Sequence, residues 1–223
     1  MKKIYFLLVT IFFVISSCQE YENLYSCDPD INSWVKSNLS EISLMGREDI
    51  IVKNNPVQIA IFRAFSSQQR LQVWLDKLDE VVKLDWSTEE KAHIMSIRNA
   101  LKEEWFSDEF RKDSVKFQPV NLFEKDWCLE GIKKFGWTQQ LITSMVGRLE
   151  KLIDKQGNLK VVILKSANVA VETSAEGCTC NVAWDMCGGP FGISSCHSTS
   201  CTQSPWGCGM LFGYYCDGEC FLL

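Results

Sequence analysis

The chain has 223 residues, 46% of them apolar and 23% charged, with a formal net charge of −5. The apolar fraction excludes a wholly disordered protein, and the acidic balance gives no reason to expect nucleic acid or an anionic membrane surface as a partner. The length allows two folding units, because most domains contain about 100–150 residues.

Residues 1–17 are typical of a secretory signal peptide. A basic start at Lys2 and Lys3 precedes an almost wholly apolar stretch from Ile4 to Ile15. This stretch is shorter than the roughly 20 apolar residues that a bilayer-spanning helix needs. We therefore expect the segment to be removed during export.

Cys18 lies where a bacterial lipoprotein carries its lipid. Ile15-Ser16-Ser17-Cys18 is similar to a lipobox, whose cysteine is diacylated and becomes the new N-terminus. The alternative is cleavage nearby that leaves Cys18 unmodified. We predict lipidation of Cys18, with residues 18–27 as a tether to the cell's own membrane. Gln19 follows the cysteine instead of Asp, which in similar lipoproteins favours the outer membrane.

Residues 28–157 show the 3.6-residue periodicity of α-helices, and we predict a bundle of five or six of them. Three helices begin at Ser66, Ser87 and Thr138, and the first two have a Gln or Glu three residues later, as in a capping box. The last helix is expected to end before Gly157. Strong patterns predict helices at 66–82, 87–105 and 138–153, and weaker ones at 33–44, 56–65 and 122–134.

This helical domain contains no Gly-rich phosphate loop, nucleophile elbow or cluster of metal ligands, so we do not expect an enzyme. Its carboxylates, Glu150 among them, lie mostly opposite the apolar stripes and are expected to be exposed. Cys27 and Cys128 are its two cysteines, an even pair in an exported chain. They could form a disulfide that ties the first helix to a late one.

The composition changes after residue 157. The last Lys or Arg is Lys165, and eight of the eleven cysteines lie between Cys178 and Cys220. Residues 158–177 are predicted to be a linker open to proteolysis, beginning with a short apolar run that could be a strand. Residues 178–223 are predicted to be a separate Gly-rich module with little regular structure or short β-strands.

The cysteines of this module are predicted to form four disulfides. So small a unit cannot bury enough apolar surface to fold without disulfides or a metal ion. Zinc is the alternative, but the module has no C-x-x-C pair and its one histidine, His197, directly follows a cysteine. Eight cysteines can pair in many ways, so the connectivity stays open. They are Cys178, Cys180, Cys187, Cys196, Cys201, Cys208, Cys216 and Cys220.

The module is rich in aromatic residues for its size, and some of them are expected to remain exposed. An exposed aromatic surface favours contact with a membrane or a partner, whereas the alternative is that the rings only cover the disulfides. The predicted contact surface consists of Trp184, Trp206, Phe212, Tyr214 and Tyr215.

Several short motifs of the module point to a known family. They are Cys178-Thr179-Cys180, Asp185-Met186-Cys187, Cys196 with Cys201, Ser204-Pro205-Trp206-Gly207-Cys208-Gly209, and Tyr215-Cys216 with Cys220. Through these residues the module resembles the fulvocin C-related bacteriocin family, although residues 19–177 show no such likeness. The resemblance implies an antibacterial peptide that inhibits growth, and it leaves the target open.

Two hypotheses follow, neither of which involves a cofactor or a metal. The first is a bacteriocin-like precursor, lipid-anchored in the cell envelope, whose module acts on a target cell envelope or receptor by contact or after release. The module has no Lys or Arg, so attraction to anionic lipid does not explain its binding. The second is a non-toxic surface lipoprotein whose cysteine-rich tip binds a partner protein or glycan.

Overall fold

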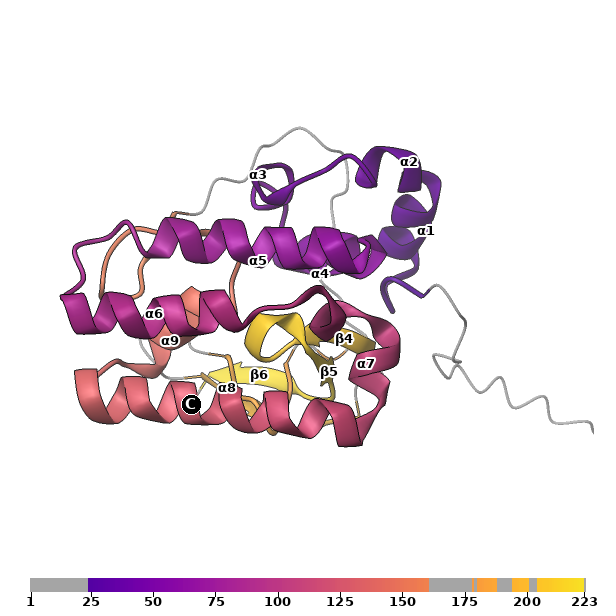
Figure 1. Cartoon of the computed structure of the whole chain (residues 1–223). Helices are drawn as coiled ribbons and strands as arrows, with labels where there is room; N and C mark the ends of the chain where they lie inside the picture. The colour runs from indigo at the N-terminus through magenta and orange to yellow at the C-terminus, as the bar shows by residue number, and fades with distance from the viewer. Residues whose placement is uncertain (1–23, 161–177, 179, 188–193, 201–203, 223) are drawn as a thin grey trace, which may run out of the picture.

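The computed structural model describes residues 24–160, 178, 180–187, 194–200 and 204–222. It confirms a mainly helical fold with a small disulfide-rich C-terminal part of short strands (Figure 1). Short helices flank the longer predicted ones, so nine α-helices occur in the described residues. They are α1 (Pro29–Ser37), α2 (Leu39–Ile42), α3 (Arg47–Ile50), α4 (Asn55–Ala64), α5 (Ser67–Val81), α6 (Thr88–Ala100), α7 (Asp108–Lys112), α8 (Ser114–Phe135) and α9 (Gln139–Val146).

Helices α5, α6 and α9 begin where the sequence predicts because their caps form. The Ser66 side chain accepts a hydrogen bond from Gln69 N, and Gln69 Oε1 accepts one from Ser66 N, both at 3.2 Å. Ser87 and Glu90 make the corresponding pair of bonds, and Thr138 caps α9. Each cap stabilises its helix by about 1 kcal/mol.

The end of α9 differs from the prediction. The helix stops at Val146 instead of continuing to residue 153, because the chain turns at Gly147 and pairs strand β1 (Lys151–Leu152) with β2 (Leu159–Lys160). Gly157 lies in this hairpin with φ +88° and does not end a helix. The remaining residues of the apolar run predicted at 160–164 lie outside the described part of the chain.

Helix α8 is longer than predicted. Asp113 caps it by accepting hydrogen bonds from Val115 N and Lys116 N, and the helix then passes through Pro119. Pro119 is exposed on the surface of α8. The helices α3 and α7 were not predicted, since four or five residues span too few turns to show a period. The helix predicted at 87–105 ends at Ala100, and the 3-10 helix η1 (Glu103–Phe106) takes the place of its last turn.

The described residues of the C-terminal part form two antiparallel sheets of two strands each. Strand β3 (Ser194–His197) pairs with β6 (Glu219–Leu222), and β4 (Ser204–Cys208) pairs with β5 (Tyr214–Cys216). The 3-10 helix η2 (Met210–Phe212) connects β4 to β5.

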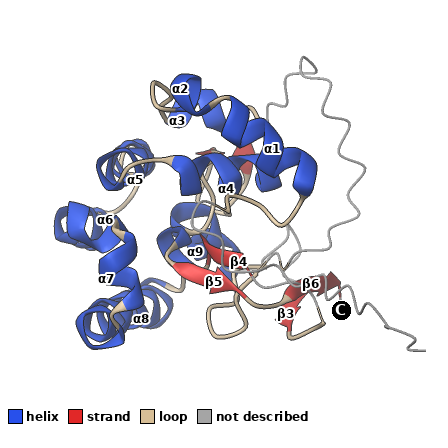
Figure 2. Ribbon diagram, turned by 90° about the vertical axis from the view of Figure 1, so that its right-hand side faces the viewer, coloured by secondary structure: helices blue, strands red, loops and turns tan. Residues whose placement is uncertain are grey.

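Both parts of the chain contribute to one hydrophobic core. Figure 2 shows α5, α6, α7 and α8 as a curved wall, with α9 and the hairpin β4–β5 on its inner side. Trp74 and Met145 of the helices are fully buried in this core, as are Met210 and Leu211 of η2. The separate module expected from the composition change therefore shares its core with the helices.

Candidate functional site

Three disulfides in the described residues hold the C-terminal segment together. They join Cys180 to Cys196, Cys187 to Cys220 and Cys208 to Cys216. Cys178 is disulfide-bonded as well, whereas Cys201 and the proposed lipid site Cys18 lie outside the described residues. Each of these three bridges closes a loop within residues 180–220, and so they crosslink the segment to itself.

Two of the bridges lie next to each other. The sulfur atoms of Cys180, Cys187 and Cys196 are all within 4.8 Å of one another, a spacing that would also suit a metal ion. All three sulfurs are bonded in disulfides, however. The thiolates that zinc would require are therefore consumed in this oxidised state.

The hairpin between β4 and β5 has an unusual backbone. Trp206, Leu211 and Phe212 have φ values of 54°, 54° and 55°, in the left-handed region that residues with a side chain rarely adopt. Each such residue costs roughly 1–2 kcal/mol. Position 207 requires glycine for two reasons. Its φ is +99°, and a Cβ there would lie 2.3 Å from Ile59 Cγ2 of α4.

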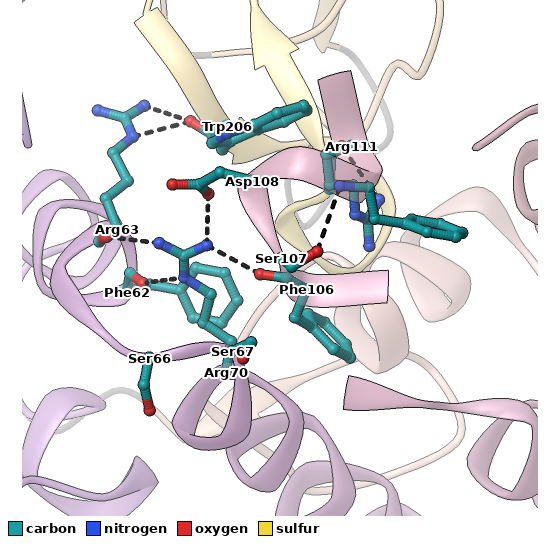
Figure 3. A network of polar contacts seen from close by, with 12 residues as sticks. Phe62, Arg63, Ser66, Ser67, Arg70, Phe106, Ser107, Asp108, Arg111 and Trp206 are labelled. Carbon is teal, nitrogen blue, oxygen red and sulfur yellow. Dashed lines mark hydrogen bonds and ion pairs between the residues drawn. The ribbon is translucent and has the colours of Figure 1, made fainter. Parts of the chain in front are cut away.

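The side chain of Arg63 of α4 binds the backbone of this hairpin (Figure 3). Its Nε donates a hydrogen bond to Trp206 O at 2.8 Å, and its Nη1 donates to Tyr25 O at 2.9 Å. Arg70 of α5 lies beside it and donates to Arg63 O at 2.6 Å, while forming an ion pair with Asp108 of α7 at 2.8 Å. The two arginines thus connect α4, α5 and α7 to the start of the hairpin.

Arg111 of α7 binds the other end of the hairpin. Its Nη1 donates to Gly213 O at 3.1 Å and its Nε donates to Trp105 O. A Cβ at position 213 would lie 1.7 Å from Arg111 Nη1, so only glycine allows this approach. The guanidinium also lies 4.7 Å from the centre of the Phe117 ring, and its burial lowers the pKa of Arg111.

Glu124 of α8 is the buried carboxylate of this contact region. Tyr214 OH donates a hydrogen bond to Glu124 Oε2 at 2.6 Å, while Oε1 is buried and makes no hydrogen bond within the described residues. Burial raises the pKa of Glu124 to about 7, against the opposing effects of Arg111 and Tyr214. Asn121 Oδ1 accepts from Trp184 Nε1 at 3.1 Å and lies 3.2 Å from the Tyr214 hydroxyl oxygen.

The predicted aromatic contact surface is wrong for four of its five residues. Only Tyr215 is exposed, at 45%. Trp184, Phe212 and Tyr214 pack in the core that the helices form, whereas the Trp206 ring packs on Tyr215 at a centroid distance of 4.8 Å. Phe212, for example, makes edge contacts with Phe62 and Trp74 at centroid distances of 5.3 and 5.4 Å. The buried residues, each at most 9% exposed, are Trp184, Trp206, Phe212 and Tyr214.

Two further predictions need correction. Cys27 and Cys128 are not bonded to each other; the Cys128 thiol instead lies 3.8 Å from Met210 Sδ, and burial raises its pKa to about 12. Glu150 is buried rather than exposed, because α9 ends early and Arg148 forms an ion pair with the carboxylate at 2.7 Å.

The residues that bind the hairpin were not among the predicted site residues. Arg63, Arg111 and Glu124 are polar and therefore resemble surface residues of amphipathic helices. A usable signal was the apolar run Met210-Leu211-Phe212, which has no polar residue to face solvent and so predicts burial. The run does not reveal which helices cover it.

The remaining candidate groups lie elsewhere on the segment. Among its described residues, the exposed large hydrophobic side chains are Val182, Tyr215 and Phe221, at 43%, 45% and 45%. His197 on β3 is exposed, with its Nε2 2.7 Å from Ser195 Oγ and its ring against Phe221. In the part of the chain that the structure describes, every helix is too short or too polar to cross a membrane.

Comparisons with protein-family models, curated proteins and solved structures give no match for this chain.

Proposed function

We propose that the chain is an exported, lipid-anchored precursor whose C-terminal segment is a bacteriocin-like antibacterial module. The observation that supports this best is the closed disulfide framework of residues 180–220. The three described bridges close within the segment, so they stay intact when it is separated from the helices. Disulfides of this kind persist in exported proteins, in keeping with the signal peptide and the lipobox at Cys18.

Binding of the module to its target would rest on apolar contact. The segment carries Asp185, Asp217 and Glu219 but no Lys or Arg, so attraction to anionic lipid does not assist it. Its rings Trp184 and Tyr214 combine an apolar body with a polar tip, which suits a lipid–water boundary or a receptor pocket. No catalytic step is involved in this proposal.

Expression of the full chain in a bacterium with an outer membrane tests this proposal. We expect mass spectrometry without reduction to find diacylated Cys18 and bridged C-terminal cysteines, and we expect the producing cells or their medium to inhibit related bacteria. The variant Cys187→Ala with Cys220→Ala should abolish the inhibition, whereas Cys18→Ala should change its location. Free C-terminal thiols in the exported protein, or no inhibition of any strain tested, would contradict the proposal.

A non-toxic surface lipoprotein is the second candidate, and one observation favours it. Tyr215 is exposed and lies against the Trp206 ring at a centroid distance of 4.8 Å, while Phe221 is exposed to the same degree. Exposed aromatic faces are suited to sugars and to partner proteins. A glycan array probed with the full chain would detect binding, which Tyr215→Ala should abolish and Leu44→Ala, also at an exposed apolar residue, should not.

A further inference from the structure

The helices and the C-terminal segment contact each other as two partners of a complex would. We propose that the helical part, residues 24–160, is a non-covalent receptor for the segment 178–222 and holds it with the rings of Trp184, Phe212 and Tyr214 covered. A chain cut between the two parts would then remain one complex. The inference rests on the proposed function only where it concerns antibacterial activity.

The polar contacts bind the backbone of the segment at two points and its side chains at a third. Arg63 donates to the carbonyl of Trp206 and Arg111 to that of Gly213, at opposite ends of the hairpin. Between them, Glu124 and Asn121 accept hydrogen bonds from side chains of the segment. Burying these charged donors and acceptors without a hydrogen-bonding partner would cost free energy. The polar side chains of the helices therefore favour the state in which the segment is bound.

The unsatisfied atoms support this view of the helices. Glu124 is fully buried although only one of its carboxylate oxygens is hydrogen-bonded among the described residues, and that bond comes from Tyr214. Without the segment, Glu124 and Arg111 would lose Tyr214 and Gly213 as partners. Buried polar groups of this kind are typical of a binding site and are uncommon in a simple structural core.

The apolar contacts cover the surface that the released segment would use. Met210, Leu211 and Phe212 are between 0% and 4% exposed in the intact chain, among Phe62, Trp74 and other residues of the helices. Trp184 and Tyr214 are covered at the same contact, where Phe117 of α8 also packs on Tyr214. Large rings buried at the centre of a contact with a polar surround are what strong protein interfaces have in common.

The backbone of the hairpin indicates that the helices impose its conformation. Left-handed φ values at Trp206, Leu211 and Phe212 persist only where the surroundings hold them. Ile59 and Arg111 approach Gly207 and Gly213 so closely that no other residue fits. The segment therefore gains its present shape from the helices, while its bridges keep the chain compact.

A cut full-length chain tests the inference directly. A site for a specific protease is inserted between Ala167 and Asn168, and the oxidised full chain is then cleaved and passed through a gel-filtration column without denaturant. We expect both fragments to elute together at the volume of the uncut chain. Elution of two separate fragments from the unsubstituted protein would overturn the inference.

Two matched variants identify the contact that holds the fragments. Tyr214→Phe removes the hydroxyl that binds Glu124, whereas Tyr215→Phe removes an exposed hydroxyl one residue away on the same strand. On dilution of the cut protein we expect the fragments of Tyr214→Phe to dissociate at about 10-fold higher concentration, and those of Tyr215→Phe to behave like the unsubstituted protein. Equal weakening by both variants would contradict the proposed contact. Should uncut Tyr214→Phe lack the circular dichroism of the folded chain, Arg63→Lys takes its place with the same expected outcome.

Growth inhibition separates this inference from the proposed function. We expect the cut complex to be inert and the segment, once separated from the helices in urea and returned to buffer, to inhibit bacteria. If the fragments co-elute but the separated segment does not inhibit growth, the receptor inference holds and the antibacterial proposal is contradicted. Inhibition by the intact, co-eluting complex would contradict the claim that the helices cover the active surface.

Discussion

The helical part and the C-terminal segment are stabilised by different means. The helices α5, α6 and α9 have capped ends, and their apolar stripes form most of the core. The C-terminal segment has three described disulfides and short strands, and its buried rings lie in the core of the helices. The buried clusters that belong to the segment alone consist of cysteines, whereas Met210, Leu211 and Phe212 are buried in the core that the helices form.

The largest effect is expected where the segment enters the common core. Replacing Phe212 by Ala should lower the free energy of unfolding of the whole chain by about 3–5 kcal/mol, because its ring fills space between Phe62 and Trp74. Urea unfolding followed by far-ultraviolet circular dichroism, which reports the helices, measures this. Phe221→Ala is the control, at an exposed ring, and should change stability by less than about 1 kcal/mol. An unchanged helical transition in Phe212→Ala would show that the two parts unfold independently.

The contribution of each disulfide to the free energy of unfolding should increase with the length of the loop that it closes. The bridge Cys187–Cys220 spans 33 residues and Cys208–Cys216 spans 8. Loop entropy then predicts losses of about 3.7 and 2.5 kcal/mol when each pair is replaced by Ala. The same urea titration, on the two double variants, compares them. If removal of the short bridge were the more harmful change, packing of Cys208 and Cys216 would outweigh loop closure.

The helical part can be tested through Lys77 of α5, which should make the free energy of unfolding depend on pH. Burial, and then the nearby Arg47 guanidinium, lower the pKa of Lys77 from 10.5 to about 7, and its Nζ donates a hydrogen bond to Glu150 O. Between these two values the unfolded chain holds a proton that the folded chain lacks, so the free energy of unfolding rises with pH. The steepest rise for one group is about 1.4 kcal/mol per pH unit.

Lys77→Met should remove this rise. Its free energy of unfolding, measured in urea at intervals from pH 7.5 to 9.5, is expected to stay flatter than that of the unsubstituted chain. Lys83→Met, on the same chain segment, serves as the control and should leave the slope unchanged. Identical slopes in all three proteins would contradict the shifted pKa.

A smaller effect is expected at the helix caps. Ser87→Ala removes the side chain that accepts from Glu90 N and should cost about 1 kcal/mol. Ser40→Ala, at an exposed position of α2, should cost less. Thermal unfolding of the two variants provides the comparison, and equal melting temperatures would show that this cap contributes nothing measurable.

The sequence predicted the helices better than the packing of the C-terminal segment, for physical reasons. Capping boxes and apolar periods are local, so Ser66, Ser87 and Thr138 were sufficient to locate three helix starts. The early end of α9 was missed because Leu149 and Leu152 continue the apolar period, although they reach the core from a turn and a strand. An apolar period predicts which residues are buried, but it does not predict whether their backbone is a helix, a turn or a strand.

The site was harder to predict because its contacts join residues far apart in sequence. The cysteines of the C-terminal segment indicated disulfides from composition alone; three bridges lie wholly within the described residues, and Cys178 is bonded as well. By contrast, Glu124 and Tyr214 are 90 residues apart, and Arg63 and Trp206 are 143 apart. No local pattern encodes such pairs, so buried rings were taken for an exposed surface.

Hydrogen exchange on the oxidised full chain tests the shared core most directly. The measurement compares backbone amides of residues 206–214 with those of α5 in increasing urea, with reduction only after the exchange is stopped. We expect both regions to lose protection together in one global opening, as parts of one cooperative unit. Protection that persists in residues 206–214 after α5 has exchanged, or the reverse, would show two independent cores and contradict the account.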